Sequence, residues 1–141
     1  MIAIGIDPGE RRIGIAVSDT RGVLARPLTV LPCQSLAADV ARIKELAVSS
    51  RAGRVVVGLP VNLSGSAGPS AQRARRFANA LRRALDTEVV LWDERLTTVE
   101  ADRTLKAAGG RPARRRAMRD SAAAAVMLQS YLDSQREGPR E

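Results

Sequence analysis

The sequence predicts one domain of the α/β class, built on a mixed sheet. The N-terminal third alternates β-branched residues with small ones, which is the period of a strand. Downstream, apolar residues recur at helical spacing on either side of two further strand-like runs. The 141 residues amount to one domain of ordinary size. We expect residues 1–133 to form this domain and residues 134–141 to form a polar, frayed tail.

The first elements form an antiparallel meander. Residues 2–7 and 13–19 are two strands, and the intervening Pro-Gly-Glu-Arg-Arg at 8–12 is a hairpin turn. A third strand lies within 22–31, where Pro27 indicates a sheet edge or a bulge.

Helices and strands alternate after the meander. A helix is expected over 36–48 with Ser35 as its N-cap, followed by a strand at 54–58 covered on both faces. Pro69 can open the next helix, whose apolar stripe leaves the arginines off its buried side. We expect those arginines to form a solvated helix face; they are Arg73, Arg76, Arg82 and Arg83.

The C-terminal elements are a strand at 88–94, a helix over 97–108 and a last helix over 117–134. Three antiparallel strands followed by this alternation give a mixed sheet, since an all-parallel one would need a helix between every two strands.

The composition restricts the possible chemistry. Lys+Arg number 23 and Asp+Glu 15, a net charge of +8, so an anionic partner is expected. The chain has no histidine and one cysteine, which excludes Ser-His-Asp and Cys-His mechanisms, histidine-ligated zinc and an intramolecular disulfide. With no secretory signal, no long apolar stretch and no disulfide framework, we expect a cytoplasmic location.

Three acidic residues stand where strands end or a helix begins: Asp7, Glu94 and Asp120. Ligands of open α/β sheets bind beyond strand ends, so these carboxylates could converge there and hold divalent ions that activate water. Each also has a purely structural explanation. Asp7 precedes a Pro-Gly turn, Glu94 could pair with an arginine, and an acid in a first helical turn is favoured by the helix dipole. Strand alternation points Asp93 away from Glu94.

Four ordered segments carry a resemblance: GIDPGERRIGIAVSD, VVGLPVNLSGSAGP, WDERLTTVEA and RDSAAAAVMLQSYL. They resemble the YqgF family of small bacterial nucleases, which are similar to Holliday junction resolvases and described as pre-16S rRNA nucleases. The resemblance covers nearly the whole chain. It implies an RNase H-like fold with a five-stranded sheet, and endonucleolytic processing of the 5′ end of pre-16S rRNA in ribosome biogenesis. The family's acidic residues match Asp7, Glu94 and Asp120, implying Mg²⁺ or Mn²⁺ as cofactor.

Arginines near each acid in sequence are expected to contact nucleic acid through its phosphates; they are Arg11, Arg12, Arg95, Arg111, Arg114, Arg115 and Arg116. Asn62 and Ser64, on the loop after the strand at 54–58, are expected to add neutral hydrogen bonds to the nucleic-acid backbone. The segment that leads into Asp120, RPARRRAMR, is richer in arginine than is usual in the family. This departure bears on substrate preference. Every aromatic residue falls on a core or strand position, so we expect recognition of backbone shape.

Other functions stay open at this stage. A Holliday junction resolvase would act on branched DNA as a two-fold dimer, whereas the sequence leaves monomer and homodimer equally possible. A non-catalytic assembly factor could bind nucleic acid, including the precursor of the small ribosomal subunit, with the same fold and charge. An actin-like ATPase lobe would share the Asp-Pro-Gly turn, but that architecture needs two lobes.

Overall fold

A computed structural model describes residues 1–60, 68–96 and 119–137, with the backbone alone at 119, 120 and 137. Five strands form one sheet in the order β3-β2-β1-β4-β5. β1 pairs antiparallel with β2 and β2 with β3, whereas β4 lies parallel to both β1 and β5. Their bounds are β1 Ile2–Pro8, β2 Arg12–Ser18, β3 Ala25–Pro32, β4 Ala52–Leu59 and β5 Glu88–Asp93. The mixed five-stranded sheet confirms the predicted fold class.

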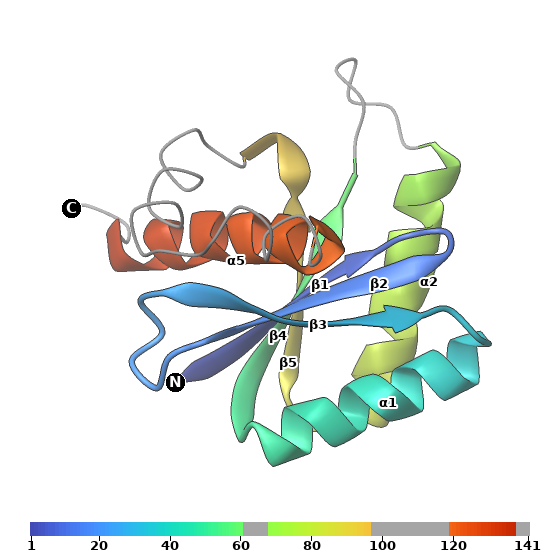
Figure 1. Ribbon diagram of the computed structural model, residues 1–141, viewed down its shortest axis with the longest axis horizontal. Helices are drawn as coiled ribbons and strands as arrows, with labels where there is room; N and C mark the ends of the chain where they lie inside the picture. Colours follow the sequence, from blue (N-terminus) through green and yellow to red (C-terminus); the bar gives the residue numbers. More distant parts are fainter. Residues whose placement is uncertain (61–67, 97–118, 138–141) are drawn as a thin grey trace.

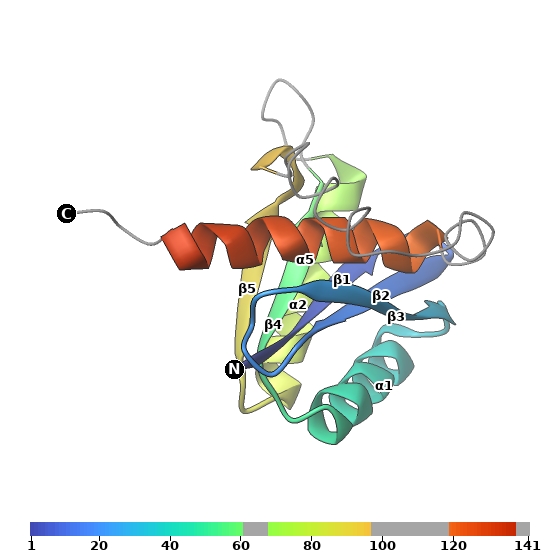
Figure 2. The same cartoon turned by 60° about the vertical axis from the view of Figure 1, so that its left-hand side comes forward.

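The helices divide between the two faces of the sheet (Figures 1 and 2). α5 (Arg119–Glu137) crosses one face, whereas α1 (Leu36–Ser49) and α2 (Pro69–Ala84) cover the other. Because alternate residues of a strand point to opposite faces, β1 presents large residues to α1 and α2 and small ones to α5. Ile4 and Ile6 belong to the first core cluster and are fully buried.

Small residues on the other face let α5 approach closely. Ala3 and Ala16 belong to the core cluster shared with α5. A Cβ added to Gly5 would lie 2.8 Å from Leu128 Cβ and 3.3 Å from the carbonyl oxygen of Ala124. The alternation of β-branched and small residues in the sequence therefore encodes two different packing distances.

Local signals account for the helix starts and the edge strand. Ser35 caps α1, since its Oγ accepts a hydrogen bond of 3.1 Å from Ala38 N, and a cap of this kind contributes about 1 kcal/mol. Pro69 is the first residue of α2. β3 lies at the sheet edge, and its pairing with β2 shifts register beside Pro27, so both readings of that proline are confirmed.

Several expected boundaries were displaced. The last helix runs over Arg119–Glu137, so residues 135–137 of the expected tail are helical. β5 ends at Asp93, and Glu94 opens a 3-10 turn, η1 (Glu94–Leu96), instead of ending the strand. The helix expected over 97–108 lies outside the described residues. Within the described part of the chain, no helix is both long and apolar enough to cross a bilayer.

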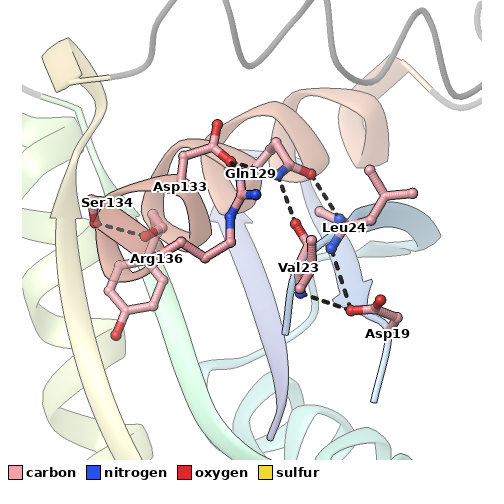
Figure 3. Close-up of polar contacts among 9 residues, drawn as sticks. Asp19, Val23, Leu24, Gln129, Asp133, Ser134 and Arg136 are labelled. Atoms are coloured by element: carbon pink, nitrogen blue, oxygen red, sulfur yellow. Dashed lines mark hydrogen bonds and ion pairs between the residues drawn. The ribbon is translucent and has the colours of Figure 1, made fainter. Parts of the chain in front are cut away.

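A buried glutamine fixes α5 to the connection between β2 and β3 (Figure 3). Gln129 Oε1 accepts from Ala25 N at 2.9 Å, and Nε2 donates to the carbonyl oxygen of Val23 and to Asp133 Oδ1, each at 2.9 Å. Asp19 holds the same connection, because its Oδ1 accepts from Val23 N at 2.8 Å. The side chain of Gln129 is thus buried with its amide fully hydrogen-bonded, and it sets the position of α5 over the sheet.

Candidate active site

Asp7 lies near the end of β1, on the face covered by α5. It pairs in register with Gly14 of β2 and follows Gly5 by two residues, so strand alternation places both on the side of α5. The carboxyl is half-buried. Gly9 makes the next turn possible: its N–H donates to the carbonyl oxygen of Arg12 at 2.9 Å, and a side chain there would collide with that oxygen.

Glu94 reaches the same end of the sheet from β5, which lies parallel to β4. It follows β5 directly, and its carboxylate passes over Gly58 in β4, where an added Cβ would lie 2.9 Å from Glu94 Oε1. Met127 of α5 closes the contact from above, 3.5 Å from the same Cβ position. Sequence reasoning did not select Gly58. A glycine inside an apolar strand is the signal that could have found it, since it marks a close approach.

The two carboxyl groups interact directly. The pKa of Glu94 is raised from its ordinary value of 4.5 to about 7. Partial burial is the largest cause, followed by the charge of Asp7, a hydrogen bond with Asp7 and the charge of Asp93. Glu94 is therefore about half protonated at neutral pH. The structure places Asp7 and Glu94, two of the three acids selected from the sequence, in contact.

Asp93 belongs to a different interaction. Its Oδ2 lies 2.7 Å from Nη2 of Arg95, and hydrogen bonds from Arg95 lower the pKa of Asp93. Arg95, expected to contact nucleic acid, is thus engaged with the neighbouring acid. The adjacent residues Asp93 and Glu94 consequently differ in environment: one carboxylate has an arginine, and the other has a second carboxylate.

A serine of α5 holds the turn that carries Glu94. Ser130 Oγ donates to the carbonyl oxygen of Leu96 at 2.7 Å, and Trp92 Nε1 donates to Ser130 Oγ at 3.4 Å. The Trp92 and Tyr131 rings meet edge to face at 5.3 Å, and Arg54 Nη1 donates to the Tyr131 hydroxyl at 2.7 Å. η1 is therefore fastened to α5 through Ser130, whose side chain is buried. No motif in the sequence distinguishes Ser130, since its role depends on contacts over a long sequence separation.

Asp120 is the second residue of α5, and its side chain lies outside the described part of the structure. Its backbone is one helical turn before Ala124, the residue that packs against Gly5 of β1. Among the described side chains, no three acidic, cysteine or histidine residues form a cluster. The structure thus brings together two members of the expected triad, and the third stays a prediction.

The expected nucleic-acid contacts are described only in part. Arg11 and Arg12 are exposed on the turn that follows Asp7. The others lie outside the described residues: Asn62, Ser64, Arg111, Arg114, Arg115 and Arg116. The α2 arginines do not form a uniform solvated face. Arg82 donates to the carbonyl oxygen of Val89 at 3.1 Å, and Arg73 lines a pocket.

The donor set fits a hard divalent cation. Ionisation of both carboxyl groups is unfavourable while they are in hydrogen-bond contact, and a cation beside them would favour it. Their ligand atoms are oxygens, which Mg²⁺ and Mn²⁺ prefer, and the groups that act on Glu94 are burial and other carboxylates. Asp7 and Glu94 therefore meet the chemical requirement of a metal site.

Comparison with known proteins agrees with this geometry. Residues 1–134 match the RuvX family model, described as Holliday junction resolvase. A protein of Pelotomaculum thermopropionicum named "Putative pre-16S rRNA nuclease" is 47% identical, covering 100% of this chain and 92% of its own length. A Myxococcus xanthus protein of the same name is 45% identical, covering 96% of this chain and 90% of its own.

Solved structures share the fold at low sequence identity. Thermus thermophilus RuvC in complex with a Holliday junction substrate aligns with a TM-score of 0.64 at 16% identity, covering 98% of this chain and 96% of that one. The fowlpox virus resolvase in complex with junction DNA gives a TM-score of 0.55 at 11% identity, covering 96% and 99%. These likenesses confirm the RNase H-like fold, and with the full-length family match they establish that the chain belongs to the RuvX family.

Proposed function

We propose that the protein is a divalent-metal-dependent endonuclease of structured nucleic acid that processes the 5′ end of pre-16S rRNA in the cytoplasm. The observation that carries the proposal is the contact between the Asp7 and Glu94 carboxyl groups at the ends of β1 and β5. The names of the relatives support rRNA as the substrate. The net charge of +8 suits a polyanion.

Asp7 and Glu94 are the residues that would hold the metal, with Asp120 as the proposed third ligand. Bound there, Mg²⁺ or Mn²⁺ would supply an activated water and stabilise the leaving oxygen of a phosphodiester. Glu94 would then hold the cation as a carboxylate, because a nearby positive charge lowers the pKa that the Asp7 charge raises. Because Gly58 has no side chain, it leaves space for the Glu94 carboxylate. In a chain without histidine, this arrangement replaces a side-chain general base.

Arginines beside the acids would hold the substrate through its phosphates. Arg11 and Arg12 lie on the turn that begins directly after Asp7, so a phosphate near the carboxylates is within the reach of long side chains on that turn. Phe77 and Tyr131 are buried in the two cores. Recognition would then depend on backbone shape and salt concentration more than on base identity.

The test is metal-dependent cleavage of a pre-16S rRNA 5′ leader by the wild type and by Asp7→Asn, Glu94→Gln and Asp120→Asn. We expect each substitution to abolish cleavage without unfolding the protein. Asp93→Asn is the matched control, because it alters the adjacent acid that faces Arg95, and it should retain cleavage. Equal cleavage by wild type and Asp7→Asn would overturn the proposal and leave a binding protein without catalysis.

A second candidate is resolution of branched DNA, which the family description and the RuvC-like fold favour. Such an enzyme cuts a four-way junction symmetrically, and this requires a two-fold dimer. Sedimentation and cleavage of a labelled four-way junction, beside the RNA leader, separate the two functions. A monomer that cuts only the RNA leader eliminates the resolvase.

A further inference from the structure

A pocket of about 170 Å³ opens on the face of the sheet opposite Glu94, under the turn that follows Asp7. Pro8 and Gly9 of that turn form one wall, and Leu36 at the start of α1 forms another. Phe77 of α2 lies at the base with little of its surface exposed. Pockets for drug-sized ligands are larger, roughly 300–1,000 Å³, so this one has room for a single base or a side chain.

Two arginines give the pocket its charge. Arg73 and Arg76 are separated by three residues on α2, which places them on one side of the helix, and both line the opening. Arg73 lies close enough to Cys33 for its positive charge to lower the pKa of that thiol, although burial has the larger, opposite effect. Within the described part of the chain, neither guanidinium forms an ion pair with a carboxylate.

The acidic groups of the lining do not cancel this charge. Asp39 forms an ion pair with Arg42 and accepts a hydrogen bond of 3.0 Å from Gln34 N, so its charge is already compensated. Glu10 is exposed on the turn. Every charged residue of α2 is an arginine. The lining of the pocket therefore combines two guanidinium groups with apolar side chains.

Leu36 supports a ligand site, because this large apolar residue is 39% exposed and lines the pocket. An apolar wall with two guanidinium groups at its edge complements a planar apolar group that carries a phosphate. The pocket also adjoins the candidate active site through the peptide Asp7–Pro8–Gly9, so one substrate strand could reach both.

We propose that this pocket takes an unpaired nucleotide of the RNA substrate, with its base against Leu36 and Phe77 and its phosphate on Arg73 and Arg76. The inference rests on the proposed nuclease function, because the unpaired nucleotide belongs to the strand whose backbone is cut at Asp7 and Glu94. The base is held by contact with an apolar wall, so the pocket accepts any base. The enzyme would thereby select RNA that has an extrahelical nucleotide near the cleaved bond.

Cys33 provides a direct reporter, because it is the only cysteine of the chain and it lines the pocket. Its Sγ donates to the carbonyl oxygen of Gly9 at 3.5 Å, and burial raises the pKa of its thiol, so modification is followed at mildly alkaline pH. The rate of maleimide addition to the full chain is measured with a chelator present, which keeps the RNA intact and makes the result independent of cleavage.

The probes are an RNA hairpin with one unpaired adenosine and the same hairpin fully paired. We expect the first to slow modification of Cys33 several-fold and the second to leave the rate unchanged. Arg73→Ala/Arg76→Ala should abolish the protection and lower the slope of log affinity against log salt by about 1 to 2. Arg75→Ala is the matched control, because Arg75 is an exposed arginine of the same helix and does not line the pocket. This variant should keep both the protection of Cys33 and the wild-type salt dependence.

Equal protection by the two hairpins, or none by either, would overturn the inference. Protection by free adenosine monophosphate without protection by the bulged hairpin would also overturn it, because the pocket would then be a nucleotide site unrelated to the substrate. Failure of the nuclease proposal looks different: the bulged hairpin protects Cys33, but addition of Mg²⁺ or Mn²⁺ produces no cleavage.

Discussion

At the scale of single residues, the pair of Asp7 and Glu94 determines how stability responds to pH. The folded protein raises the pKa of Glu94 from 4.5 to about 7, so between these values it binds more protons than the unfolded chain does. Stability must then fall as pH rises through that window. Part of the stability of the metal-free protein near neutral pH therefore depends on the proton that Glu94 retains.

Glu94→Gln removes this dependence, because the amide cannot ionise beside Asp7. In metal-free buffer, we expect the variant to gain stability relative to wild type at pH 8 and to gain less at pH 5. Urea unfolding at both values with a chelator measures the difference. If the free energies of unfolding of wild type and Glu94→Gln differ by the same amount at pH 5 and at pH 8, the assigned contact between Asp7 and Glu94 is contradicted.

Gly58 is the second residue whose substitution is informative. Gly58→Ala places a Cβ 2.9 Å from Glu94 Oε1, so the carboxylate must move while the surrounding strand stays in place. We expect cleavage to fall by about tenfold to a hundredfold, because misplacement of a catalytic group by about 1 Å has that effect. Gly53→Ala is the control: its Cβ meets only the flexible side chain of Met1, and its cleavage rate should be unchanged.

At the scale of elements, α5 connects the parts of the site. It packs on β1 through Ala124 and Leu128 at Gly5, and it fastens η1 through Ser130. Gln129 fixes its position along the sheet (Figure 3). The helix that bears Asp120 is thus held by the same groups that place Glu94, and a shift of α5 would change both ends of the site.

Gln129→Leu tests this role. The substitution leaves Ala25 N and the carbonyl oxygen of Val23 without their buried partner, so we expect a loss of about 1–3 kcal/mol in the free energy of unfolding. Chemical denaturation measures it. Gln135→Leu, an exposed glutamine of the same helix, should change stability by less than about 0.5 kcal/mol. Equal losses in the two variants would refute the anchoring role.

The elements also show how far sequence reasoning reaches. Local signals located strands and helices well: Ser35 capped α1, Pro69 opened α2, and Pro27 marked an irregular edge strand. Contacts across long sequence separations had no such signal. Ser130, Gln129 and the room above Gly58 became visible only when α5 was placed on the sheet, because their partners lie far away along the chain.

At the scale of the whole molecule, two surfaces meet at one edge of the sheet. Figure 1 shows α5 on one face of the sheet and α1 and α2 on the other. The acidic pair lies on the side of α5, and the pocket that Arg73 and Arg76 line lies on the side of α1 and α2. The turn after Asp7 separates them, with Arg11 and Arg12 exposed on it. A strand of nucleic acid that crosses this edge would meet both surfaces.

Binding of Mn²⁺ at pH 7, measured calorimetrically in buffers of different ionisation enthalpy, tests most directly whether the acidic pair is built for a metal. Metal binding releases the protons of its ligands, and Glu94, whose pKa is about 7, is about half protonated at this pH. We expect wild type to release about half a proton for each ion bound and Glu94→Gln to bind weakly and release none, with Asp93→Asn behaving as wild type. Wild-type binding without proton release, or equal binding by Glu94→Gln, would contradict the assignment of the site.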